Sequence, residues 1–318
     1  MAPTTRRARR ADRFLRESAG TVAVIADAGG FAAMRRYATF RFTDHAGYLR
    51  QTELLLRSLA ERHGHTSVAL FDPEGFAEFC AREGLAADSQ ASRARYTAEV
   101  AARGATVPYE GQPIARLMPV LLAEHLRWET WETGTDLLAA AGSCPACDAP
   151  YSRCAFQRAA GLLAAVTERA GPGVHHLVCS LLVPSGPLTA ALHVERGAGG
   201  ALDMAEPDAL VLCTLVAVGL ATGEPGGLVL RSVPAGAVGG PSWDREERAA
   251  PGRRGEPAGP GEEVRGWSLR GGRLRALSEG EVFAAYCTDV RTGEPVPPEP
   301  GVAYRAADEL PHRDCPGD

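Results

Sequence analysis

The chain has 318 residues, 45% of them apolar and 23% charged, and a formal net charge of −5. This composition is typical of a soluble globular protein with room for one large domain or two ordinary ones. No apolar run approaches the roughly 20 residues that cross a bilayer, and the net negative charge gives no general attraction to nucleic acid or anionic lipid.

All 34 basic residues are arginine, and lysine is absent. A GC-rich bacterial genome explains this bias together with the abundant alanine, glycine and proline. The usual forms of P-loop ATPases, protein kinases and Schiff-base enzymes are excluded, because each needs a lysine amine. The sequence also contains no G-x-S-x-G nucleophile elbow and no H-E-x-x-H zinc motif.

The first 16 residues have a charge opposite to that of the rest. They carry six arginines and one acid, Asp12, so their net charge is +5 and that of the remaining residues is −10. We expect residues 1–18 to form a flexible basic arm that either contacts an unknown protein or nucleic acid by charge or has no partner. The arginines are Arg6, Arg7, Arg9, Arg10, Arg13 and Arg16. No helix-turn-helix or RNA-binding signature accompanies them.

Cysteine usage predicts the compartment. The chain has eight cysteines and no persuasive signal peptide, because Asp27 interrupts the apolar stretch that follows the basic arm. Cysteines in this setting indicate a reducing environment, so we expect a cytoplasmic protein with no membrane contact.

The first part of the chain alternates strand and helix signals. Strands are expected at residues 21–26, 36–42 and 67–71, and helices at 44–64, 72–82, 89–103 and from 113 onwards. Pro119 lies inside the last of these helices and should kink it or split it in two.

The second part of the chain begins with a helix. We expect helices at residues 152–169, 208–221 and 279–287, and strands at 174–183, 188–195, 228–233, 267–269 and 274–277. Residues 208–221 are apolar on all sides, which indicates a buried helix. Residues 235–265 have few large apolar side chains and are expected to be a disordered insertion, and the Pro-rich tail from 291 is expected to be irregular.

These patterns predict an α+β (mixed α/β) fold with two α/β segments joined by a helical region and a cysteine knuckle. The expected divisions are the arm at 1–18, the N-terminal α/β segment with helices at 19–135, the knuckle and its helix at 136–170, the C-terminal segment at 171–290 with its insertion, and the tail at 291–318.

The stretch that concentrates chemistry is Cys144-Pro145-Ala146-Cys147, with Cys154 seven residues further on. A C-x2-C turn brings two thiolates to one zinc ion at about 2.3 Å each. Cys154 would enter from the first turn of the next helix, where the helix dipole favours the thiolate. The sequence therefore predicts a zinc-type site, with a redox pair, an iron–sulfur site and three unrelated cysteines as the alternatives.

A tetrahedral site needs a fourth ligand. The nearest downstream histidines, His175 and His176, are our candidates, and His125 is a further option. Cys179 alternates with Leu177 and Leu181 on the same expected strand, which is typical of a core residue. His193-Val194-Glu195 has the H-x-E of zinc deaminases, but their P-C-x-x-C partner should follow it, and the cysteine pair here precedes it.

Two functions are consistent with these observations. The first is a cytoplasmic bacterial binding or regulatory protein with a structural zinc. The alternative is a metal-dependent hydrolase or transferase that uses an open cysteine and histidine site, with carboxylates such as Glu195. Four protein ligands indicate a structural metal, whereas three ligands and a water molecule indicate catalysis.

Overall fold

The computed structural model describes residues 20–63, 65–144, 147–235, 261–289 and 292–311. The basic arm and most of the expected insertion lie outside these residues. The described chain has the α+β fold that the sequence predicts, and it divides into two compact units, residues 1–128 and 129–318. The boundary falls inside helix α6, Ile114–Ala140, seven residues before the end of the expected N-terminal segment.

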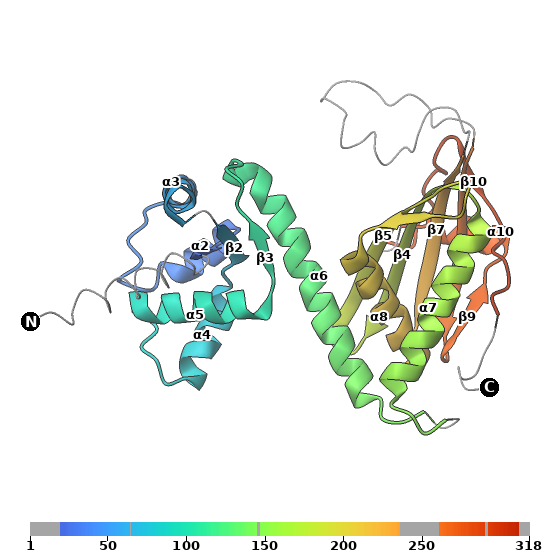
Figure 1. Ribbon diagram of the computed structural model, residues 1–318, viewed down its shortest axis with the longest axis horizontal. Helices are drawn as coiled ribbons and strands as arrows, with labels where there is room; N and C mark the ends of the chain where they lie inside the picture. The colour runs from blue at the N-terminus through green and yellow to red at the C-terminus, as the bar shows by residue number, and fades with distance from the viewer. Residues whose placement is uncertain (1–19, 64, 145–146, 236–260, 290–291, 312–318) are drawn as a thin grey trace, which may run out of the picture. The chain divides into compact units, whose positions relative to one another are not determined.

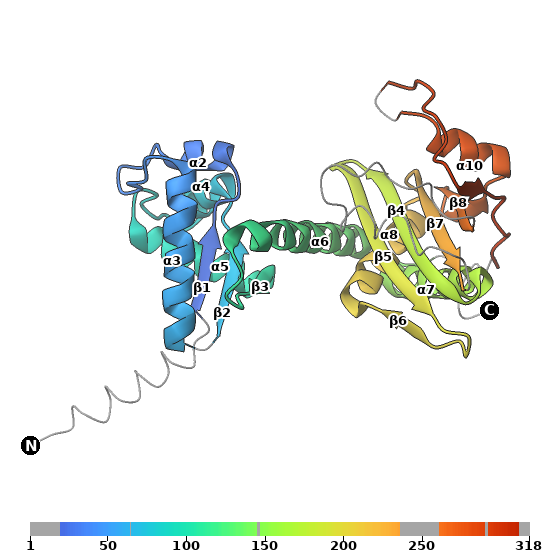
Figure 2. The ribbon, with the colours of Figure 1, turned by 90° about the horizontal axis from the view of Figure 1, so that it is seen from above.

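The first unit is a three-stranded sheet with helices on both faces (Figure 1). Strand β1 (Gly20–Val24) is parallel to β2 (Thr66–Leu70), and β3 (Thr106–Pro108) is antiparallel to β2. Figure 2 shows α3 beside these strands. The helices are α2 (Ala28–Met34), α3 (His45–His63), α4 (Pro73–Arg82) and α5 (Gln90–Arg103).

Side-chain caps fix where two of these helices begin. The Asp72 carboxylate accepts hydrogen bonds from the backbone N–H groups of Glu74 and Gly75, and Pro73 occupies the first helical position of α4. The Asp44 carboxylate accepts from the Gly47 N–H at the start of α3, as its position in the sequence predicts. This bond and the Thr43 hydroxyl lower the pKa of Asp44.

The strand expected at residues 36–42 is wrong. These residues form turns, and Phe40 packs against Phe31 and Tyr48, with ring centroids 5.6 and 5.8 Å apart. The Asp88 carboxylate accepts hydrogen bonds from the N–H groups of Ala38 and Thr39, which therefore need no neighbouring strand. The alternation in the sequence reflects an aromatic cluster rather than a sheet face.

Of the kink or split expected at Pro119, the split is wrong, because α6 is one helix of 27 residues. Pro119 lies in its second turn, where the missing N–H costs the helix a single bond to the Ala115 carbonyl. The remaining residues continue the helix to Ala140.

The second unit contains a larger, mostly antiparallel sheet with the order β10-β8-β7-β4-β5-β6, and β9 pairs with β8. Its strands are β4 (Gly173–Val183), β5 (Gly186–Arg196), β6 (Leu202–Met204), β7 (Gly226–Pro234), β8 (Glu262–Arg270), β9 (Arg273–Ala276) and β10 (Val302–Tyr304). The predicted hairpins β4–β5 and β8–β9 are confirmed.

Two expectations for this unit need correction. Residues 262–265, assigned to the insertion, begin β8, since Val264 and Glu263 pair with Arg231 and Ser232 of β7. The tail from residue 291 contains β10, which is parallel to β8. Residues 262–265 are too polar for the sequence pattern to indicate a strand, and residues 302–304 are apolar but too few to indicate one. A tertiary ion pair joins both segments to β7.

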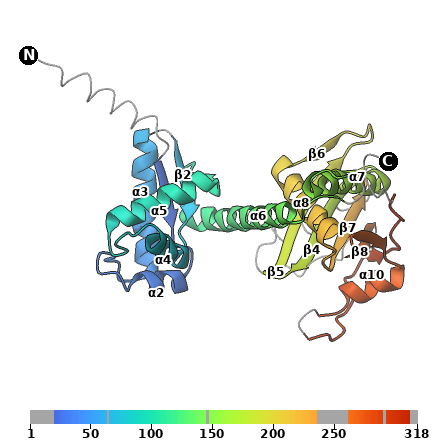
Figure 3. The ribbon, with the colours of Figure 1, turned by 90° about the horizontal axis from the view of Figure 1, so that it is seen from below.

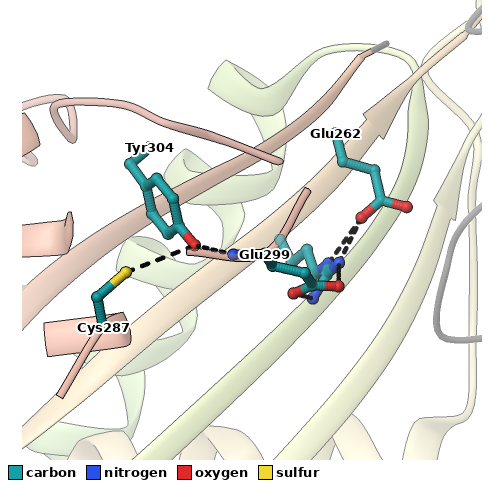
Figure 4. Close-up of polar contacts among 5 residues, drawn as sticks. Glu262, Cys287, Glu299 and Tyr304 are labelled. Carbon is teal, nitrogen blue, oxygen red and sulfur yellow. Dashed lines mark hydrogen bonds and ion pairs between the residues drawn. The ribbon is translucent and has the colours of Figure 1, made fainter. Parts of the chain in front are cut away.

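That ion pair is centred on the Arg231 guanidinium, which contacts the carboxylates of Glu262 and Glu299 (Figure 4). The Glu262 side chain is 2% exposed, so Arg231 compensates a charge removed from water. Glu299 belongs to the tail, and its backbone N–H donates to the Tyr304 hydroxyl at 3.2 Å. The tail is thereby fixed to β7 and β8. Helix α10, Glu279–Tyr286, precedes it.

Two helices cover one face of this sheet: α7 (Tyr151–Ala170) and α8 (Glu206–Thr222). Figure 3 shows them side by side over β4 and β5. Residues 211–220 of α8 are all buried, as their composition predicts. Gly219 allows α8 to approach the sheet, because a Cβ atom there would lie 2.2 Å from Leu269 Cδ2 and 3.0 Å from Leu181 Cδ1.

Gly219→Ala should therefore destabilise the protein by about 1–3 kcal/mol, since Leu269 is fully buried and has no space to move into. Gly161→Ala is the matched control, because a Cβ on this exposed glycine of α7 has nothing within 4 Å. It should stabilise the protein by up to about 1 kcal/mol. Urea unfolding of both variants measures the difference, and a Gly219→Ala variant as stable as the control would contradict this packing.

Candidate metal centre

The structure brings the three predicted cysteines together. The Sγ atoms of Cys144, Cys147 and Cys154 all lie within 4.8 Å of one another, and those of Cys144 and Cys154 are 3.5 Å apart. Sulfur ligands at about 2.3 Å in a tetrahedron lie about 3.8 Å from one another. The cluster therefore has the spacing that a single tetrahedral metal ion needs.

A short backbone turn creates this spacing. The Cys144 N–H donates to the Ala149 carbonyl at 2.8 Å, and the Asp148 N–H donates back to the Cys144 carbonyl at 2.9 Å. Asp148 has a φ of 56°, a left-handed conformation that closes the loop, and Asn or Asp tolerate it better than most residues. Ser143 and Pro150 form a bridge, and α7 starts at the next residue.

Cys154 enters the cluster from the first turn of α7. Cys144 and Cys154 are 3% and 2% exposed, and Tyr151 packs against both, whereas Cys147 is exposed. Because the partial positive charge of a helix N-terminus favours anions, this position suits a thiolate ligand. The cluster can hold a metal ion with two sulfurs shielded from water and one accessible.

The structure places the two candidate histidines elsewhere. His175 is fully buried on β4, where Nδ1 lies 3.0 Å from the Ser232 hydroxyl and Nε2 lies 2.9 Å from the Gly171 carbonyl oxygen. His176 points to the opposite face, paired with His193 of β5 and Arg231 of β7. Neither residue belongs to the thiol cluster.

The other residues that the sequence singles out also lie apart from the cluster. Cys179 is completely buried in the core between α8 and the sheet, and this burial raises its pKa to about 12. His193 and Glu195 are solvent-exposed, as their alternation predicts, with Nε2 and Oε1 3.7 Å apart. Histidine, cysteine, aspartate and glutamate are the residues that could bind a metal ion. Among those that the structure describes, the three cysteines form the group whose spacing suits one ion.

Sequence reasoning missed one feature, a cavity of about 530 Å³ in the second unit. It lies where α7 passes α8, and its walls include Ala160 and Ala164. Two small residues four positions apart on a helix leave room beside it, and this spacing is the signal that would have indicated the cavity.

Comparison with known proteins gives one match, and it does not include the thiol cluster or the cavity. Residues 5–112 match a family described as a domain of unknown function (DUF8829), about a third of the chain. The three cysteines lie outside that match. No curated protein and no solved structure matches the chain significantly. Within the part of the chain that the structure describes, no helix has the length and apolar character needed to cross a bilayer.

The environment of His175 predicts a dependence of stability on pH. Burial lowers its pKa, and this outweighs the opposing effect of the hydrogen bond to Gly171. The unfolded state therefore binds a proton at higher pH than the folded state, so stability should fall as the pH drops below about 6.5.

His175→Gln keeps a donor and an acceptor but does not titrate, so it should reduce the loss of melting temperature between pH 7 and pH 5.5. Part of the loss should remain, because burial also lowers the pKa of His176. His65→Gln, at an exposed position of the first unit, is the control and should retain the loss seen in the unmodified protein. If the melting temperature of His175→Gln fell as much between pH 7 and pH 5.5 as that of the unmodified protein, this histidine would not be the cause of the acid sensitivity.

Proposed function

We propose that the protein is a cytoplasmic bacterial binding or regulatory protein in which Cys144, Cys147 and Cys154 hold a structural zinc ion. The observation that carries the proposal is the mutual distance of the three Sγ atoms, all within 4.8 Å. Thiolates are soft ligands that select zinc, copper(I) or iron–sulfur clusters among biological metals. Zinc suits a tetrahedral thiolate site and has no redox chemistry of its own.

The position of the cluster supports a structural role. It lies between α6 and α7, two consecutive helices of the chain, and it closes the turn that joins them. Two of its sulfurs are buried beneath Tyr151. A metal bound here would fix the α6–α7 connection to the first turn of α7 and would have little access to a substrate.

The exposed Cys147 favours the second candidate, a metal-dependent hydrolase or transferase. Three protein ligands with an accessible fourth position are the arrangement of catalytic zinc sites. The fourth ligand therefore decides between the two. His312 and Cys315 lie outside the described residues and are the side chains to test.

The zinc proposal predicts about one zinc ion per purified chain, by elemental analysis. Cys144→Ser, Cys147→Ser and Cys154→Ser should each lower the zinc content and the melting temperature, because a tetrahedral site loses a ligand and the turn loses its cross-link. Cys287→Ser, at a buried cysteine outside the cluster, should keep the zinc.

Single substitutions of His312 and Cys315 then locate the fourth ligand, and His175→Gln and His176→Gln, at positions outside the cluster, should keep the zinc. A metal-free protein with normal stability would contradict the zinc proposal. A metal whose removal leaves the melting temperature unchanged would contradict the structural role and favour the enzyme.

We also propose a partner for the basic arm. The arginines of residues 6–16 contact either the phosphate groups of a nucleic acid or the carboxylates of an acidic protein. Deletion of residues 1–16 removes five net positive charges. It should weaken binding to DNA or RNA and reduce the slope of log affinity against log salt by up to about 5. Fluorescence anisotropy at several salt concentrations measures both. An unchanged slope would show that the arm makes no phosphate contacts.

A further inference from the structure

The cavity of about 530 Å³ beside α7 has the size of a small-molecule site. Its floor is formed by Leu177 of β4 and Leu192 of β5, which are 0% and 4% exposed. One wall is the face of α7 that carries Phe156, Ala160 and Leu163, and the opposite wall is the first half of α8. All of these elements belong to the second unit, so the cavity is complete within one compact body.

The two polar side chains inside the cavity, Thr167 and Cys213, are already hydrogen-bonded within the protein. The Thr167 hydroxyl donates to the carbonyl oxygens of Leu163 and Ala164, at 3.1 and 3.0 Å. The Cys213 thiol lies 3.7 Å from the Phe156 carbonyl oxygen, and burial raises its pKa to about 12, so it stays uncharged. The interior therefore offers a ligand apolar surface and no demand for a polar partner.

The mouth of the cavity differs from its interior. Leu202 and Met204 of the edge strand β6 and Leu210 of α8 line it, and each is 43% exposed. Three large apolar side chains gathered at one opening leave a surface that a ligand can cover. Glu206 stands at the same opening and is the one acidic or basic residue that lines the cavity.

We propose that this cavity binds a small lipophilic amine, with its apolar body between α7 and α8 and its ammonium group at the Glu206 carboxylate. The volume and the apolar floor select a compact hydrocarbon body, and the single negative charge at the mouth selects a cation over an anion. This site is separate from the thiol cluster and requires no metal.

The test is calorimetric titration of the full chain with three eight-carbon probes: octylamine, octanol and octanoate. Octylamine should bind most tightly and octanoate most weakly. Glu206→Gln should weaken octylamine about two- to fivefold, as expected for an exposed ion pair, leave octanol unchanged and strengthen octanoate. Equal affinities for amine and acid, or no binding of any probe, would overturn the proposal.

A second pair of variants locates the site. Ala160→Trp should fill the cavity and abolish binding of octylamine, whereas Gly161→Trp adds the same side chain at the next, unhindered position and should leave binding intact. Ala164→Trp, one turn further along the same wall, repeats the test if Ala160→Trp lowers the melting temperature. Unchanged octylamine binding in a folded cavity-filling variant would place the ligand elsewhere and overturn the assignment.

Discussion

The apolar helix α8 must be shielded from water on every side, and the other elements of the second unit pack around it. All ten residues from Val211 to Leu220 are buried, so the helix has no face for water. The sheet covers one side, with Gly219 permitting contact with Leu181 and Leu269, and α7 and the end of α6 cover others. On α6, Gly134 permits the approach, because a Cβ there would lie 3.0 Å from Thr214 Cγ2.

The thiol cluster lies at the joint between these two covering helices. Two of its sulfurs come from the α6–α7 connection and one from the first turn of α7, so a metal ion would close the connection onto the start of α7. The same helix, α7, forms a wall of the apolar cavity, beginning at Phe156, two residues after Cys154. Metal binding, coverage of α8 and the shape of the cavity therefore depend on one helix.

Local signals predicted much of this architecture. Capping residues such as Asp72, the apolar composition of α8 and the glycine turn between β8 and β9 each act within a few residues, and those elements were found.

The predictions that failed concern segments whose structure depends on contacts with residues far away in the sequence. Residues 36–42 form no strand because Asp88, about 50 positions away, satisfies the N–H groups of Ala38 and Thr39. The three residues of β10 form a strand only through pairing with β8, 40 positions earlier in the chain. The cysteine spacing predicted the cluster, whereas the candidate histidines bond or pair elsewhere, since strand alternation turns His175 into the core and His176 away from it.

The proposed metal ion at Cys144, Cys147 and Cys154 would hold α7 over α8. Hydrogen–deuterium exchange of the α8 backbone, compared between the metal-loaded and chelator-treated full chain, tests this directly. We predict that removal of the metal speeds exchange in the first turns of α7 and across Val211–Leu220, while the helices of the first unit keep their protection. Equal protection of α8 with and without metal would contradict the claim.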